Sequence, residues 1–217
     1  MTPYDTRQSV DYSPLLVHFT KNTRMNRADR VGPQHPLEPF KQSTALDRLL
    51  SILTKRRIIA SPMPFLAGDS NAVCFTECVW ESLTEIAEAQ YSPYGVVFNK
   101  KAIFDRGGGP ALYVRGDLFK AHDAAIPKEV LPFVVPFDPE AVIKPEVPQD
   151  WVHEREWRLP VDFTFDYSDI QYVIVKTLDD ARVVLQTIGS QNLLEDRLIP
   201  TDVHTAIKSA WSGGYHG

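Results

Sequence analysis

Acidic and basic residues alternate with large apolar residues across residues 151–160, which read Trp-Val-His-Glu-Arg-Glu-Trp-Arg-Leu-Pro. If this stretch is one extended strand, successive side chains point to opposite faces. Glu154, Glu156 and Arg158 then share one face, while Trp157 belongs to the other. Two carboxylates and a guanidinium on one face form either an ion-paired sheet surface or a functional site.

More polar side chains stand at the ends of other segments that are mainly apolar. They are His18 and Thr20, the run from Phe75 to Glu77, and Tyr113 with Arg115. Clefts often form at strand ends, because loops leave the sheet there and the rigid backbone holds the side chains in place. If the strands are neighbours, these residues converge on one site. If they are not, each is a polar residue satisfied separately, and the pattern alone leaves both interpretations open.

Length and composition indicate an ordinary globular protein. The chain has 217 residues, of which 43% are hydrophobic and 24% charged, enough for one substantial core. We expect a single α+β domain over residues 15–211, preceded by an N-terminal arm at 1–14 and followed by a disordered tail at 212–217.

Charge and hydropathy narrow the classes of partner. The net charge of −5 argues against a surface that neutralises many phosphates, although a local basic groove is compatible with it. No long apolar window and no signal peptide are apparent, so we expect a cytoplasmic protein that does not enter a membrane.

Motifs for metal binding and nucleophilic catalysis are not evident. Cys74 and Cys78 lack a nearby second pair of ligands, and the six histidines are scattered, so no metal site is expected. The chain also lacks a Gly-x-Ser-x-Gly elbow.

Periodicity predicts the elements that must position the polar residues. Leucines spaced as on one helix face follow Thr44 and Asp47, which form a capping box. Further helices are expected at 78–90 and 177–189, and strands at 15–20, 72–77, 94–99, 111–115, 130–137 and 170–176. A tight glycine turn is expected at 107–110 and an arginine-rich flap at 21–40. These elements predict an α+β fold with a mixed, mainly antiparallel sheet flanked by helices.

Six short motifs follow one another along residues 15–176. They are Leu-Val-His-Phe-Thr, Arg-Arg-Ile-Ile-Ala-Ser, Val-Cys-Phe-Thr-Glu, Tyr-Gly-Val-Val-Phe-Asn-Lys, Pro-Ala-Leu-Tyr-Val and Glu-Arg-Glu-Trp-Arg. Together they resemble uncharacterised bacterial families grouped with the abortive-infection protein AbiGi. The histidine strand, the helix after it and the late glutamate strand more distantly resemble ADP-ribosyltransferases, including the DNA-modifying toxin DarT.

The transferase resemblance implies a split, twisted sheet with NAD as the substrate in a cleft between its halves. His18 would match the histidine that binds the adenosine ribose, with Thr20 beside it at the end of the same strand. Glu156 would match the catalytic glutamate that holds the nicotinamide ribose. A carboxylate suits this role, because fixed negative charge stabilises an oxocarbenium-like transition state.

The rest of the NAD site follows from the same resemblance. Phe75 with the threonine after it, or Tyr113, would replace the aromatic-and-serine signature of the family, and Tyr113 could stack on nicotinamide. Arg158 or Arg115 could meet the pyrophosphate, since a planar guanidinium matches phosphate oxygens.

We therefore expect an NAD-cleaving ADP-ribosyltransferase-like protein with a protein or nucleic-acid acceptor, in phage defence or a toxin–antitoxin pair. One alternative is a non-catalytic component of such a system that binds a protein partner or a nucleotide signal. A metal-dependent nuclease that uses Glu154 and Glu156 is the third hypothesis.

Overall fold

The computed structural model describes residues 12–22, 43–62, 67, 70–77, 92–138, 142–144, 147–148, 152, 155–189 and 192–203. Several predictions lie outside these residues: the helix at 78–90, the tail at 212–217, and most of the flap at 21–40 and of the arm at 1–14.

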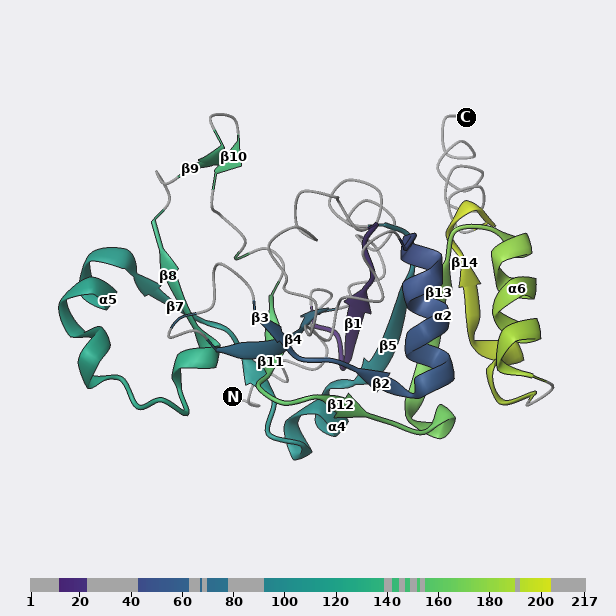
Figure 1. Cartoon of the computed structure of the whole chain (residues 1–217), viewed down its shortest axis with the longest axis horizontal. Coiled ribbons are helices and arrows are strands. Elements are labelled where there is room, and N and C mark those ends of the chain that lie inside the picture. The colour runs from purple at the N-terminus through teal and green to yellow at the C-terminus, as the bar shows by residue number, and fades with distance from the viewer. Residues whose placement is uncertain are drawn as a thin grey trace, which may run out of the picture.

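Eight strands form the central sheet. They are β1 (Leu15–Phe19), β3 (Ser61–Pro62), β4 (Asn71–Glu77), β5 (Gly95–Asn99), β6 (Gly109–Pro110), β11 (Trp157–Leu159), β13 (Ile170–Val175) and β14 (Leu198–Pro200). Their order is β14-β13-β5-β1-β4-β11-β6, with β3 paired to β4 (Figure 1). Among the described strands of this sheet, only β13 and β14 pair in parallel, so the prediction of a mainly antiparallel sheet in an α+β fold is confirmed.

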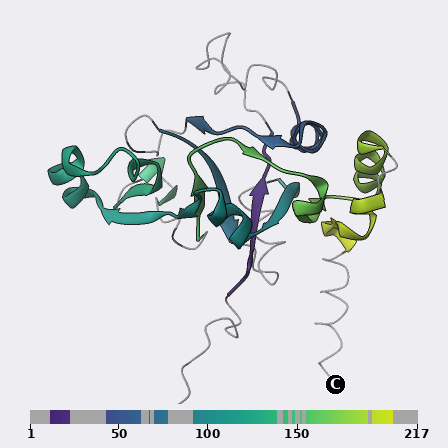
Figure 2. The same cartoon turned by 90° about the horizontal axis from the view of Figure 1, so that it is seen from below.

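Three smaller pairs of strands accompany the sheet. They are β2 (Arg57–Ile58) with β12 (Phe163–Thr164), β9 (Val142–Lys144) with β10 (Val147–Pro148), and β7 (Leu112–Arg115) with β8 (Val134–Phe137). Strands β7 and β8 are parallel and are joined through α5 (Gly116–His122) and two 3-10 turns, η4 (Asp123–Ala125) and η5 (Leu131–Phe133). We call residues 112–137 the side lobe, because they extend away from β1 in both views (Figures 1 and 2).

Helix α2 (Ala45–Lys55) begins at the predicted capping box, and α6 (Leu178–Ile188) begins at a second one. The hydroxyl of Thr44 accepts a bond from the backbone N–H of Asp47, and the Asp47 carboxylate accepts one from Thr44 N at 2.8 Å. Thr177 and Asp180 repeat this exchange at α6. Each box satisfies amide groups that the first helical turn leaves without partners.

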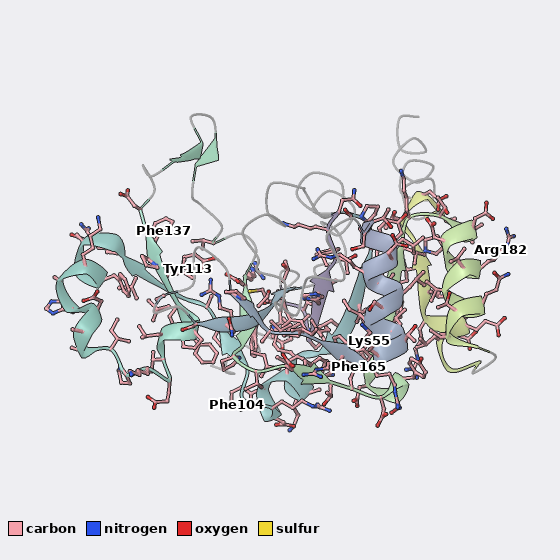
Figure 3. All side chains as sticks on the ribbon, viewed as in Figure 1. Lys55, Phe104, Tyr113, Phe137, Phe165 and Arg182 are labelled. Carbon is pink, nitrogen blue, oxygen red and sulfur yellow. The ribbon has the colours of Figure 1, made fainter. Side chains whose placement is uncertain are left out.

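The main core fills one face of the sheet under α2 and α6. Its buried members include Leu49 and Leu53 of α2 and Val184 of α6. A cluster of phenylalanine rings joins it, and Phe165, labelled in Figure 3, lies near the lower end of α2. The opposite face of the sheet holds a smaller cluster that contains Val17, Phe19, Val97 and Ile174.

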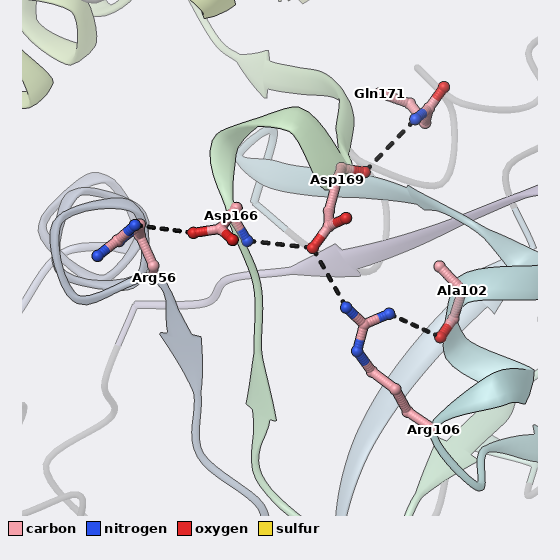
Figure 4. Close-up of polar contacts among 6 residues, drawn as sticks. All are labelled: Arg56, Ala102, Arg106, Asp166, Asp169 and Gln171. Carbon is pink, nitrogen blue, oxygen red and sulfur yellow. Dashed lines mark hydrogen bonds and ion pairs between the residues drawn. The ribbon is translucent and has the colours of Figure 1, made fainter.

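Two short elements lie between strands: α4 (Lys100–Asp105) follows β5, and the 3-10 turn η7 (Tyr167–Asp169) precedes β13. Figure 4 shows the contacts between them. Arg56, just after α2, donates to Asp166 at 2.8 Å, and Arg106, just after α4, donates to Asp169 at 3.2 Å. The backbone N–H of Asp166 also donates to the Asp169 carboxylate. The network joins the ends of α2 and α4 to the turn that precedes β13.

The glycine turn predicted at 107–110 is shorter, because β6 begins at Gly109, and its geometry explains two of the glycines. Gly107 has a φ of 92°, which favours a residue without a side chain. A Cβ on Gly108 would lie 2.5 Å from a methyl carbon of Ile103 and 2.9 Å from the Ile103 carbonyl oxygen. Gly109 then enters β6, so the turn also delivers an edge strand to β11.

Two predicted strands prove to be shorter. The prediction of one strand over 151–160 is wrong, because β11 begins only at Trp157. Arg155 has a φ of 44°, which interrupts the extended backbone, and its N–H donates to the Val152 carbonyl in a turn. The strand predicted at 130–137 begins at Val134, after a 3-10 turn that contains Pro132.

Candidate functional site

Strands β1, β4 and β11, which carry His18, Phe75 and Arg158, lie next to one another in the sheet, and Glu156 directly precedes β11. Val17 on β1 pairs with Thr76 on β4, so the next pair in this antiparallel register is His18 with Phe75. The ring centroids of His18 and Phe75 are 5.9 Å apart. Phe75 in turn pairs with Trp157 on β11. His18, Phe75 and Trp157 therefore form one row across three neighbouring strands.

The half-buried ring of His18 is held in one orientation. Its Nδ1 lies 2.9 Å from the carbonyl oxygen of Cys74. Because a carbonyl only accepts, Nδ1 must carry the hydrogen, and Nε2 of the neutral ring is left as an acceptor. The pKa of His18 is lowered to about 4, mainly because the ring is buried. The hydrogen bond to Cys74 acts in the opposite direction and raises the pKa, whereas the positive charge of Arg48 also lowers it. His18 is therefore neutral at physiological pH.

Thr20 is buried, and its hydroxyl is used within the fold. It donates to the carbonyl oxygen of Ala45 at 2.7 Å and lies 3.3 Å from that of Tyr94. These contacts join the end of β1 to the start of α2 and to the residue before β5. In this arrangement Thr20 positions β1, and its NAD contact stays a prediction.

Glu156 and Arg158 form an enclosed ion pair. Nε and NH2 of Arg158 donate to the two carboxylate oxygens of Glu156, each at 3.0 Å. The Arg158 side chain is 0% exposed and that of Glu156 is 8% exposed. NH1 of Arg158 donates to the carbonyl oxygens of Pro132 at 3.0 Å and Val134 at 3.2 Å. The pair therefore fastens the side lobe to β11.

Strand alternation places this ion pair on the face opposite His18. Arg158 pairs with Cys74, whereas Trp157 pairs with Phe75 on the face of His18. The prediction that Glu156 and Arg158 share a face is confirmed by their contact, and Trp157 does pack against the main core. The structure brings their strands together but does not turn His18 and Glu156 toward one cleft.

Tyr113 and Arg115 lie in the side lobe, away from β1. Tyr113 contacts Phe137 edge to face with ring centroids 6.0 Å apart (Figure 3). Arg115 forms an exposed ion pair with Asp117 at 3.0 Å. The structure does not gather these two residues with His18, so their NAD contacts stay predictions.

Sequence reasoning missed most of a charged cluster around Glu77, at the end of β4. Oε2 of Glu77 lies 3.2 Å from Nζ of Lys100, and Oε1 accepts from the backbone N–H of Ser13 at 2.9 Å. NH1 of Arg155 is 3.7 Å from Oε1. From the sequence, only the polar residues at the end of β4 could be predicted as part of a site. Lys100 and Arg155 come from distant segments, which the sheet places next to Glu77.

Other classes of site find no support in the part of the chain that the structure describes. Within it, no three His, Cys, Asp or Glu residues gather as metal ligands would. None of its helices combines the length and apolar character needed to cross a bilayer.

Comparisons with protein-family models, curated proteins and solved structures found no match.

Proposed function

We propose that the protein is an ADP-ribosyltransferase-like enzyme that cleaves NAD and acts on a macromolecule in phage defence or a toxin–antitoxin pair. The observation that carries the proposal is the adjacency of β1, β4 and β11. By the family resemblance, the ribose-binding histidine is His18 on β1, one candidate for the aromatic signature is Phe75 on β4, and the catalytic Glu156 directly precedes β11.

The state of His18 supports the ribose contact. A neutral imidazole whose Nδ1–H is bound to the Cys74 carbonyl offers Nε2 as an acceptor. Ribose hydroxyls donate hydrogen bonds, so a fixed acceptor beside the Phe75 ring fits a nucleoside sugar. A protonated histidine would repel such a donor.

The catalytic carboxylate that the resemblance implies is Glu156. Glu156 is paired with Arg158 on the other face of the sheet. The left-handed backbone of Arg155 interrupts the alternation that assigned Glu154 to the same face as Glu156, and Glu154 lies outside the described residues. Both glutamates on this segment are therefore candidates.

The test is release of nicotinamide from NAD, measured by chromatography in the presence of host lysate as the source of acceptor. We expect the wild-type protein to release nicotinamide and either Glu154→Gln or Glu156→Gln to lower the rate by about a hundredfold or more. His18→Gln should raise KM for NAD more than it lowers kcat. Glu195→Gln, at an exposed position, is the matched control and should leave the rate unchanged.

Circular dichroism of each variant separates loss of chemistry from loss of fold. Lack of nicotinamide release by folded wild-type protein with every lysate would refute the transferase proposal. So would full activity of both glutamine variants.

The Glu156–Arg158 ion pair favours a second candidate, a non-catalytic defence component that binds a protein partner or a nucleotide signal. A carboxylate enclosed in a structural pair is not available to a substrate in this arrangement. Isolation of the protein with a stoichiometric partner, or NAD binding in calorimetry without nicotinamide release, would support this candidate. Turnover of NAD would exclude it.

A further inference from the structure

A cavity of about 290 Å³ lies near the start of β1, beside α4, at the end of the strand away from Thr20. Three aromatic residues, Tyr12, Phe104 and Trp157, and two lysines, Lys100 and Lys101, line it. It draws on segments that are far apart in the sequence. None of these residues belongs to the predicted NAD site.

Two of the three aromatic rings at the cavity are exposed to solvent. Phe104 is 63% exposed and Tyr12 39% exposed, and Phe104 stands at α4 in Figure 3. Trp157 is half-buried, with its other side packed against the main core. Aromatic side chains held at an open cavity can stack on a flat ring supplied by a ligand.

Cations stand beside these rings. Nζ of Lys100 lies 4.7 Å from the ring centroid of Tyr12 and 5.5 Å from that of Trp157. Lys100 also meets Glu77, as does Arg155. The exposed partner of Lys101 is Asp105, and such surface pairs are weak enough to exchange for another anion.

Among the residues that line the cavity, Lys100 and Lys101 are cationic and none is acidic. The cavity therefore combines flat apolar walls with positive charge. A ligand that matches both features has a planar aromatic ring and a negative group joined to it.

We propose that this cavity binds one nucleotide unit, with its base against the aromatic rings and its phosphate at the lysines. The volume of 290 Å³ lies just below the usual range for ligand pockets, roughly 300–1,000 Å³, which fits a mononucleotide better than a dinucleotide. The unit is either a free 5′-mononucleotide or one residue of a single strand, which offer the same chemistry. The inference does not depend on NAD cleavage.

The test is isothermal titration calorimetry of the whole protein with AMP, adenosine and ribose 5-phosphate. We expect AMP to bind saturably and each fragment to bind at least about tenfold more weakly, because each lacks one half of the recognised group. Phe104→Ala should weaken AMP binding by about tenfold, the usual effect of removing one stacking ring. Lys101→Gln should weaken it by about threefold, with a smaller salt dependence.

Matched controls come from the side lobe. Leu118→Ala removes an exposed apolar residue and Lys120→Gln an exposed lysine, and neither should change AMP binding. Because Phe104 and Lys101 are exposed, their variants should keep the wild-type circular dichroism spectrum.

A short oligothymidylate in the same titration distinguishes the two sources. Tighter binding of the oligomer than of TMP supports a single strand as the natural ligand, and equal or weaker binding supports a free nucleotide. Absence of saturable binding by every probe would overturn the proposal. Binding that survives both Phe104→Ala and Lys101→Gln unchanged would overturn it as well.

Discussion

Removing one member of the Glu156–Arg158 pair should lower the free energy of unfolding far more than removing an exposed charge does. Glu156→Ala leaves the guanidinium of Arg158, whose side chain is 0% exposed, without its carboxylate. Arg158→Met leaves the carboxylate behind and deprives the Pro132 and Val134 carbonyls of a donor. Either variant therefore leaves one charge of the ion pair enclosed without the opposite charge that it faces in the fold.

The expected magnitude follows from this enclosure. Breaking a buried ion pair from one side costs about 3–5 kcal/mol. For a chain of this length each kcal/mol lowers Tm by roughly 2–4 °C, so the melting temperature of Glu156→Ala should fall by about 10 °C. The double variant that combines Glu156→Ala with Arg158→Met removes both charges and should cost less than the sum of the single changes.

A double-mutant cycle, followed by urea denaturation with circular dichroism, measures the coupling. We expect about 2–3 kcal/mol between Glu156 and Arg158. The exposed Lys101–Asp105 pair supplies the control cycle, with an expected coupling below about 1 kcal/mol.

A coupling for Glu156 and Arg158 no larger than that of the control pair would refute this reasoning. Glu156 would then not be held for stability, and the interpretation of this residue as a catalytic carboxylate would gain strength. The cycle therefore bears on function although it measures only folding.

Three further predictions concern stability. Folding lowers the pKa of His18 from the ordinary 6.5 to about 4, so the unfolded chain binds more protons than the folded one between these pH values. The free energy of unfolding should therefore drop by at most about 3 kcal/mol as pH falls through this window. The His18→Gln variant should lose less stability over the same pH series, measured by urea denaturation. Thr44→Ala should cost about 1 kcal/mol in urea denaturation, because α2 loses its cap. Asp162→Asn should cost about 1–2 kcal/mol, since the carboxylate accepts from Arg57 at 2.9 Å, whereas Asp105→Asn at an exposed pair should cost less than about 0.5 kcal/mol by thermal melting.

The parts of the fold that could be predicted are those fixed by local chemistry. The capping box of Thr44 and Asp47 involves residues three positions apart, so the start of α2 can be read directly from the sequence. Alternation over a short strand likewise predicted that Glu156 and Arg158 share a face, because it needs only an extended backbone between them.

The parts that could not be predicted depend on contacts between distant segments. The carbonyl acceptors of Arg158 lie 24 and 26 positions away in the sequence, and no local pattern marks them. The left-handed backbone of Arg155 gave no signal either, since it is not a glycine. Alternation was therefore extended through Arg155, and the predicted strand came out too long.

The side lobe has a consequence for access to the ion pair. Helix α5 buries none of its residues, so the lobe should be among the first parts of the chain to open in hydrogen exchange. Opening would withdraw the Pro132 and Val134 carbonyls from Arg158 and expose the guanidinium and Glu156 together. If opening costs about 4 kcal/mol, about one molecule in a thousand is open. Any ligand of these two groups would then bind about a thousandfold more weakly than its contacts alone allow, and a partner that holds the lobe open would restore that affinity.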